Sequence, residues 1–156
     1  MPVDVKVGFF VDVSNLYYCA NHRFGRKLDY GKLLDLVTKM TGNTPTAVAY
    51  GYQVDHESSG FIARLRRAGY VTKYKKPRSV SGTVTKADWD VGIAMDVART
   101  VGDYNLIILG TADGDMAPVV EYIQEKGVDC VVIGCNISKA LRNITTCIEI
   151  TEDCLV

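Results

Sequence analysis

Four aspartates stand at positions where this chain is able to do chemistry. Asp113 and Asp115 both lie in LGTADGD, directly after an apolar run. Asp12 closes another apolar run in FFVDVSNLYY, and Asp90 lies in KADWDVGIAMD. Like charges repel, so a site that gathers these carboxylates needs a cation or needs some of them to be protonated. Oxygen ligands of this kind suit Mg²⁺ or Mn²⁺, and no histidine or cysteine is placed to favour zinc.

These acids need elements that bring them together, and the chain alternates regularly between two patterns. Apolar runs predict strands at 5–11, 46–54, 70–76, 105–110, 128–134 and 147–150. Helical spacing predicts helices over 29–41, 57–69, 88–99, 115–126 and 138–143. The alternation predicts a three-layer α/β domain with a mainly parallel central sheet and helices on both faces.

The predicted sheet gives the acids a common place. Residues 5–11 are apolar almost throughout, which is typical of a central strand, whereas 70–76 alternates like a strand near an edge. In an open parallel sheet the ligand crevice lies beyond the carboxyl ends of the strands. Acids that follow strands, or that begin the next helix, are therefore expected to meet at one edge.

Composition bounds the class of protein. The 156 residues are 47% hydrophobic, which predicts one domain over residues 1–156 with a single core. The chain has 18 basic and 18 acidic residues, so any attraction to nucleic acid has to be local. No segment approaches the roughly 18 apolar residues of a membrane span. Five cysteines without CxxC spacing predict free thiols in a reducing cytoplasm, so the expected location is cytoplasmic.

Each acid also has an ordinary reading. Asp88 and Asp115 are equally well explained as helix N-caps or first-turn acids. The ordinary alternative for Asp12 is a turn acid directly after a buried strand, but Asn15 and two tyrosines follow it closely, which favours a functional role. Asp96 lies inside a predicted helix, six residues after Asp90 and on another helical face. It is therefore expected to be an exposed acid, or an acid that contacts the metal ligands without binding the metal itself. Asp88 is also a candidate for that supporting role.

A local basic segment offers a path for a polyanion. It has no acid and contains Arg64, Arg66, Arg67, Lys73, Lys75, Lys76 and Arg78. Tyr70 and Tyr74 lie among these cations and are candidates for stacking on bases. A solubilising helix face and a charged edge strand explain the same residues. A smaller patch, NHRFGRK at 21–27, is expected in a loop. The loop 77–87 is long enough to close over a substrate, and disorder without function explains it equally well.

The chain resembles the NYN domains of the LabA-like type, which belong to the PIN-like nuclease superfamily. Four stretches in the family's order carry the resemblance: FVDVSNLY, KADWDVGIAMD, LGTADGDMAPVVEYIQEKG and SKALRNI. The family's motif residues match Asp12, Asn15 and Asp90, and its Ser-Gly-Asp-Gly-Asp-Phe motif corresponds here to 111–116. In this chain Thr111, Ala112 and Met116 depart from that motif, and Ala87 stands where glycine is frequent.

The resemblance implies a Mg²⁺- or Mn²⁺-dependent ribonuclease. Asp12, Asp90 and Asp113 would be metal ligands, and Asp115 would be a further ligand or would orient water. Asn15 and Thr111 would contact the substrate phosphate or its water, and Lys86 would offset phosphate charge, with a solvated loop lysine as the alternative. RNA, single-stranded or structured, is the expected partner, no membrane is expected, and a homodimer stays open. The alternative is a non-catalytic module that binds RNA or a protein. A nucleotide site is disfavoured, because neither GxxxxGK[ST] nor GxGxxG occurs.

Overall fold

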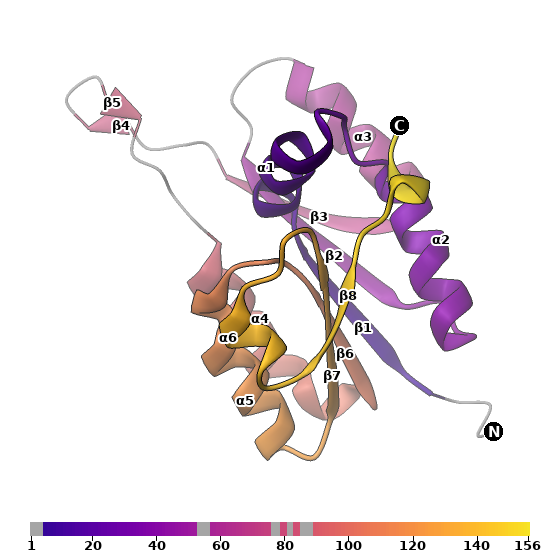
Figure 1. Ribbon diagram of the computed structural model, residues 1–156, viewed down its shortest axis with the longest axis vertical. Coiled ribbons are helices and arrows are strands. Elements are labelled where there is room, and N and C mark those ends of the chain that lie inside the picture. Colours follow the sequence, from indigo (N-terminus) through magenta and orange to yellow (C-terminus); the bar gives the residue numbers. More distant parts are fainter. Residues whose placement is uncertain (1–4, 53–56, 76–78, 81–82, 85–88) are drawn as a thin grey trace.

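Six parallel strands form the central sheet of the protein, whose computed structural model describes residues 5–52, 57–75, 79–80, 83–84 and 89–156 (Figure 1). The strand order is β3-β2-β1-β6-β7-β8. The strands are β1 (Val7–Asp12), β2 (Thr46–Tyr52), β3 (Tyr70–Lys75), β6 (Leu106–Gly110), β7 (Asp129–Gly134) and β8 (Thr146–Glu149). A separate antiparallel pair joins β4 (Ser79–Val80) to β5 (Thr83–Val84). The predicted α/β architecture is confirmed, with β1 central and β3 at an edge.

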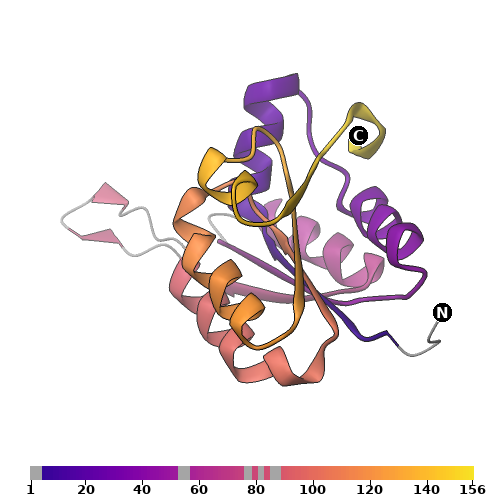
Figure 2. The ribbon, with the colours of Figure 1, turned by 60° about the horizontal axis from the view of Figure 1, so that its bottom comes forward.

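Helices cover both faces of the sheet, as Figure 2 shows. One face carries α1 (Val13–Phe24), α2 (Tyr30–Thr41) and α3 (Glu57–Ala68), and the other carries α4 (Asp90–Thr100), α5 (Ala117–Glu125) and the short α6 (Lys139–Arg142). Three 3₁₀ turns complete the elements: η1 (Val101–Asp103), η2 (Gly114–Met116) and η3 (Glu152–Cys154). None of the helices in the described part of the chain is long and apolar enough to cross a membrane.

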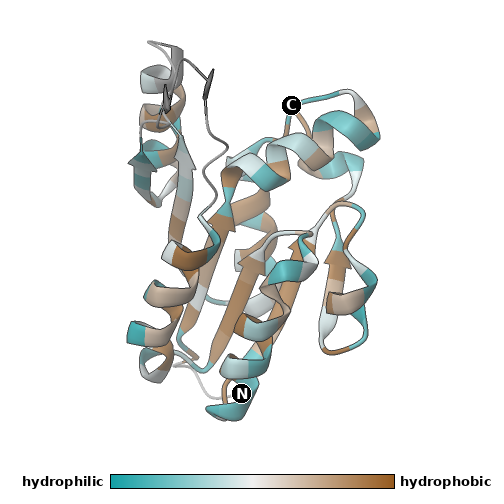
Figure 3. Cartoon of the chain, turned by 90° about the vertical axis from the view of Figure 1, so that its left-hand side faces the viewer, coloured by the Kyte–Doolittle hydropathy of each residue, from teal (hydrophilic) through white to brown (hydrophobic). Residues whose placement is uncertain are grey.

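Two apolar cores hold the layers together, because successive side chains of a strand point to opposite faces. In β1, Phe9 and Val11 pack among α1, α2 and α3, whereas Phe10 packs with α4 and α5 on the other face. All six residues of β1 are buried. The strands are accordingly hydrophobic along much of their length in Figure 3. A fully covered strand explains why the sequence of β1 shows no alternation of polar and apolar residues.

The order in which the chain adds strands to the sheet reverses at β1. From β1 the chain builds β2 and β3 on one side, then crosses to β6 on the other side of β1. The two halves also place their helices on opposite faces, so the carboxyl ends of β1 and β6 border a topological switch point. Open α/β sheets bind ligands at this point. Asp12 ends β1, and Asp113 follows β6 by three residues.

The structure corrects the sequence analysis at α1. Residues 21–24 form the last turn of this helix, not a loop, and the helix ends at Gly25 with φ 64°. Its buried residues are Val13, Leu16 and Ala20, a sparse apolar stripe that gives only a weak helical pattern. Two other helices begin later than expected. The 115–126 helix begins at Ala117 because η2 precedes it, and the 88–99 helix begins at Asp90. The predicted free thiols are confirmed for all five cysteines.

Candidate metal centre

Three carboxylates meet beyond the carboxyl edge of the sheet. One oxygen from each of Asp90, Asp113 and Asp115 lies within 4.8 Å of the other two. Asp90 comes from the first turn of α4, and the other two come from the loop after β6. Two oxygens on opposite sides of a Mg²⁺ ion, each about 2.1 Å away, are about 4.2 Å apart. The spacing of the three carboxylates therefore fits one octahedral cation.

Backbone hydrogen bonds shape the loop that carries two of these acids. The amide of Asp113 donates to Thr111 Oγ1 at 3.1 Å, and the amide of Asp115 donates to Asp113 Oδ1 at 2.9 Å. Gly114 lies so close to the α6 segment that an added Cβ would meet Ser138 Oγ at 2.6 Å. The loop is therefore held by its own caps and by its contact with the start of α6.

Thr111 does not face the substrate side that the sequence analysis expected. Its side chain is buried at 2% exposure, and its hydroxyl accepts from the amide of Asp113. The same hydroxyl also lies 3.4 Å from Asn15 Oδ1, to which it donates. A hydroxyl that makes both bonds inside the protein orients the loop, and it is not available for a phosphate.

Asn15 joins α1 to the loop after β6. Its Oδ1 accepts from the backbone amide of Ala112 at 2.8 Å. This bond fixes the orientation of the Asn15 side chain and identifies Nδ2 as the atom that donates. Asp12 is the N-cap of α1 and accepts from the amide of Asn15 at 3.1 Å. Asp12 is buried, at 8% exposure, and it is not a member of the three-carboxylate cluster. Asp12 therefore caps α1, a role that the sequence analysis did not predict.

Trp89 is a residue of the site that the sequence analysis missed. Its indole Nε1 donates to the carbonyl of Gly51 at the end of β2, at 2.9 Å. The ring packs against Tyr50 with ring centroids 5.3 Å apart, and an added Cβ at Gly92 would lie 2.5 Å from the ring. Trp89 occupies the N-cap position of α4, so this anchor fixes the backbone just before Asp90. The sequence feature that could have identified this residue is a single tryptophan in an otherwise polar stretch.

The field around the cluster is negative. Cys19 lies on α1, with its Sγ 3.9 Å from Asn15 Oδ1. Burial raises the pKa of the Cys19 thiol, and the carboxylates of Asp12, Glu149 and Asp113 raise it further. These causes favour the protonated thiol. The cluster itself consists of carboxylates alone, since Asp90, Asp113 and Asp115 are the groups that lie within 4.8 Å of one another.

Asp96 lies apart from the cluster and has its own partners. It accepts from Tyr50 Oη at 2.8 Å and from Lys73 Nζ at 2.6 Å, and Arg99 Nη1 lies at 3.1 Å. Burial by itself raises the pKa of Asp96, but the hydrogen bonds from Lys73 and Tyr50 outweigh it and hold the pKa below its ordinary value. Asp96 thus fastens α4 to β2 and β3.

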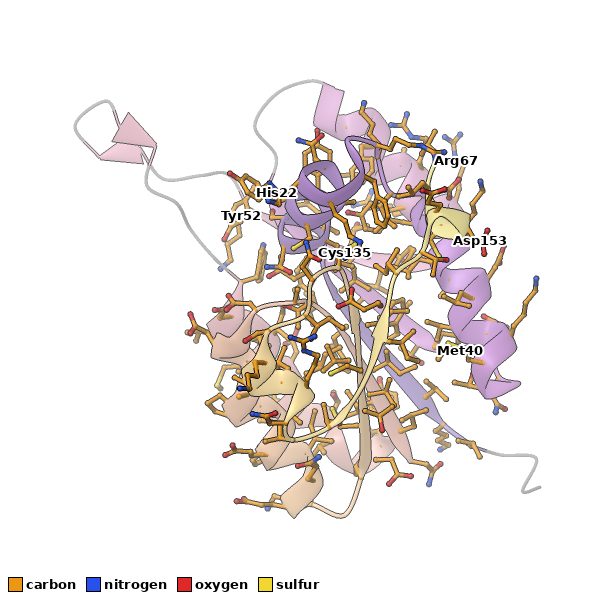
Figure 4. The ribbon with its side chains drawn as sticks, in the orientation of Figure 1. His22, Met40, Tyr52, Arg67, Cys135 and Asp153 are labelled. Atoms are coloured by element: carbon orange, nitrogen blue, oxygen red, sulfur yellow. The ribbon has the colours of Figure 1, made fainter. Side chains whose placement is uncertain are left out.

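The predicted basic segment is divided by the fold. Arg66 and Arg67 lie in the last turn of α3. Because α3 runs antiparallel to the strands, this turn lies near the start of β3 and away from the carboxyl edge of the sheet. Figure 4 shows Arg67 at the right of the view, with His22 and Tyr52 further to the left. Lys73 is neutralised by Asp96, and Arg66 Nε donates to Thr72 Oγ1 at 2.8 Å.

Among the described members of the segment, Lys75 lies at the site edge. Lys75 ends β3, with its Nζ 3.9 Å from the centre of the Trp89 ring. Of the two tyrosines proposed to stack on bases, Tyr70 is not available, and Tyr74 is partly buried against the core. Tyr70 is buried and donates to the carbonyl of Tyr30, and the hydroxyl of Tyr74 is buried too. Three predicted residues, Lys76, Lys86 and Asp88, lie outside the described residues, as do Arg78 and much of 77–87.

Comparison with known proteins agrees with this geometry. The model of the NYN domain family matches residues 6–151. The low amplitude and bright protein LabA of Synechococcus elongatus is 24% identical, over 90% of this chain and 80% of that protein. A crystal structure of a protein of unknown function from Vibrio parahaemolyticus superposes with a TM-score of 0.87 at 26% identity, covering 100% of this chain and 99% of the other.

Proposed function

This chain belongs to the NYN domain family, and from that premise we propose that it is a divalent-metal-dependent ribonuclease. The observation that carries the proposal is the convergence of Asp90, Asp113 and Asp115 at the switch point of the sheet. NYN domains form a PIN-like nuclease family, and an oxygen-only ligand set suits the cation that phosphodiester hydrolysis requires.

The donor set supports Mg²⁺ or Mn²⁺ as the ion. Three carboxylates carry enough negative charge to hold a hard divalent cation, and their mutual repulsion in its absence favours binding. When bound, such a cation neutralises phosphate charge and eases deprotonation of the attacking water. Asp12 is proposed as a fourth carboxylate of the centre, because it ends the strand next to β6.

The other residues of the site act on the substrate by position and charge. Asn15 presents Nδ2 as a donor to a phosphate oxygen, since its Oδ1 is held by the amide of Ala112. Lys75 supplies a cation at the same edge, and the Trp89 ring holds it without neutralising it. Trp89 and Thr111 are positioning residues, because each orients a segment that carries a carboxylate.

The test is cleavage of single-stranded RNA by the purified protein. We expect cleavage with Mg²⁺ or Mn²⁺, none in excess EDTA, and none for Asp113→Asn. Parallel reactions with single-stranded DNA and duplex RNA define the substrate class. RNA binding without metal-dependent cleavage would favour the alternative, a regulatory module, over the nuclease.

A further inference from the structure

Helix α1 leads directly away from the candidate metal centre. It is capped by Asp12, and Asn15 in its first turn contacts the loop that carries Asp113. A helix of 12 residues extends about 18 Å. Whatever occupies the exposed face of α1 therefore reaches the three-carboxylate cluster at one end.

Two aromatic rings are exposed on this helix. Tyr17 is 48% exposed and Tyr18 is 76% exposed, whereas the core tyrosines Tyr50 and Tyr70 are 0% and 3% exposed. Tyr18 follows Asn15 by three residues, so the two side chains are neighbours on the helix surface. A solvent-facing ring beside a phosphodiesterase centre suits a stacked base, which needs only an accessible π-face.

The charged residues within the same helix and the turn after it are all basic. Residues 13–28 contain no Asp or Glu, while His22, Arg23, Arg26 and Lys27 follow the tyrosines. Arg23 donates to Asn136 Oδ1 at 2.6 Å, and Arg26 donates to the carbonyl of Val156 at 2.8 Å. Asn136 is a neutral acceptor, so this bond leaves the charge of Arg23 in place, whereas Arg26 is engaged at residue 156. By contrast, Lys73 of the predicted basic segment is paired with Asp96.

We infer that a single strand of nucleic acid reaches the metal centre along the exposed face of α1. Unpaired bases stack on Tyr18 and Tyr17, and phosphates pass beside Arg23 and Lys27. Bases of a duplex stack on one another and present only their edges, so exposed rings on a helix select an unpaired strand. This inference rests on the proposed function, and it moves the substrate path from α3 and β3 to α1.

The first test is the affinity of a fluorescent single-stranded RNA, measured by anisotropy in EDTA. Tyr18→Ala is expected to weaken binding at least about fivefold, the lower limit for loss of one stacked base. The matched control is Met40→Ala, which removes a side chain of 42% exposure from α2. Because Tyr18 is mostly solvent-exposed, its truncation leaves the melting temperature near that of the wild type.

The second test is the salt dependence of the same affinity. Arg23→Gln combined with Lys27→Gln should lower the slope of log affinity against log salt by about 1.4, or about 0.7 for each lost phosphate contact. Glutamine keeps a donor for Asn136 in place of Arg23. Arg66→Gln combined with Arg67→Gln removes the same charge from α3 and should leave the slope unchanged. A single-stranded DNA of the same sequence distinguishes recognition of the strand from recognition of the ribose.

The outcomes separate the path from the chemistry. Binding that depends on Tyr18 and Arg23, with or without cleavage, supports the path along α1. Equal affinities for the wild type and Tyr18→Ala, or a slope that falls only in the α3 variant, overturn it even if the protein cleaves RNA. A wild-type protein that binds a duplex as tightly as a single strand also overturns it.

Discussion

Asp113 has two roles at the residue scale. It caps η2 by accepting from the amide of Asp115, and it contributes an oxygen to the three-carboxylate cluster. Asparagine keeps a side-chain oxygen that can accept the cap hydrogen bond but loses the charge. Replacement of Asp113 by asparagine thus separates the two roles.

We predict that Asp113→Asn folds normally and loses most of its thermal response to Mn²⁺. Metal that binds only the folded state stabilises it by about 2.7 kcal/mol at 100 times its Kd. The apo variant should melt at or above the wild-type temperature, because one repulsive charge is gone. Thermal melts with and without Mn²⁺ measure both effects. Asp129→Asn, at the start of β7, is the control, and an Asp113→Asn protein that responds like this control contradicts the assignment.

Asp96 gives a prediction about pH. Its folded-state pKa is depressed, so its contribution to stability is complete above the unfolded value of about 3.9 and is lost as pH falls through the folded value. Asp96→Asn should therefore lower the free energy of unfolding by about 1–2 kcal/mol at neutral pH. The difference from the wild type should shrink below about pH 4. Denaturant unfolding at several pH values measures it, and a difference that does not vary with pH would show that the carboxylate charge is not responsible.

At the scale of elements, the sequence predicted the strands better than the helix ends. Continuous apolar runs such as β1 are direct evidence of burial on both faces, so every strand of the main sheet was found. Helix α1 was missed because three buried residues among exposed tyrosines leave little periodicity. The 3₁₀ turn before α5 depends on the hydrogen bond between Asp113 and Asp115, which no propensity reports. Local patterns reveal burial but not the side-chain caps that end an element.

Trp89 gives the prediction for α4. Trp89→Phe keeps an aromatic ring near Tyr50 but removes the donor to Gly51 together with the second ring of the indole, so the backbone before Asp90 loses its anchor. We expect Mn²⁺ affinity to fall about tenfold, as when a supporting contact behind a ligand is lost. Electron paramagnetic resonance of free Mn²⁺ measures the affinity without any need for catalysis.

The control for this prediction lies under the same helix. Tyr50→Phe also removes one hydrogen bond to α4, at Asp96, away from the cluster. It should lower the apo melting temperature to a similar degree and leave Mn²⁺ affinity unchanged. If both variants lose stability and neither loses affinity, Trp89 is structural and does not position Asp90.

At the scale of the whole molecule, the order of the strands makes the site. The sequence placed the acids at one edge because parallel strands share their carboxyl ends. It was unable to rank them, since the distance among Asp90, Asp113 and Asp115 depends on how α4 packs against β2. The cations of the basic segment are close together in sequence, but they do not form one surface. The chain reverses direction between α3 and β3, so Arg66 and Arg67 lie at the amino edge of the sheet, away from the cluster.

The most direct test of the central claim is a titration of the RNA cleavage rate with Mn²⁺ in three proteins. Asp90→Asn and Asp96→Asn change the same residue type on the same helix, but only Asp90 belongs to the carboxylate cluster. The account predicts metal-dependent cleavage in the wild type, a curve close to wild type for Asp96→Asn, and loss of cleavage or a large shift to higher Mn²⁺ for Asp90→Asn. Equal curves for the two variants, or cleavage that persists in EDTA, would contradict a metal-dependent ribonuclease at this site.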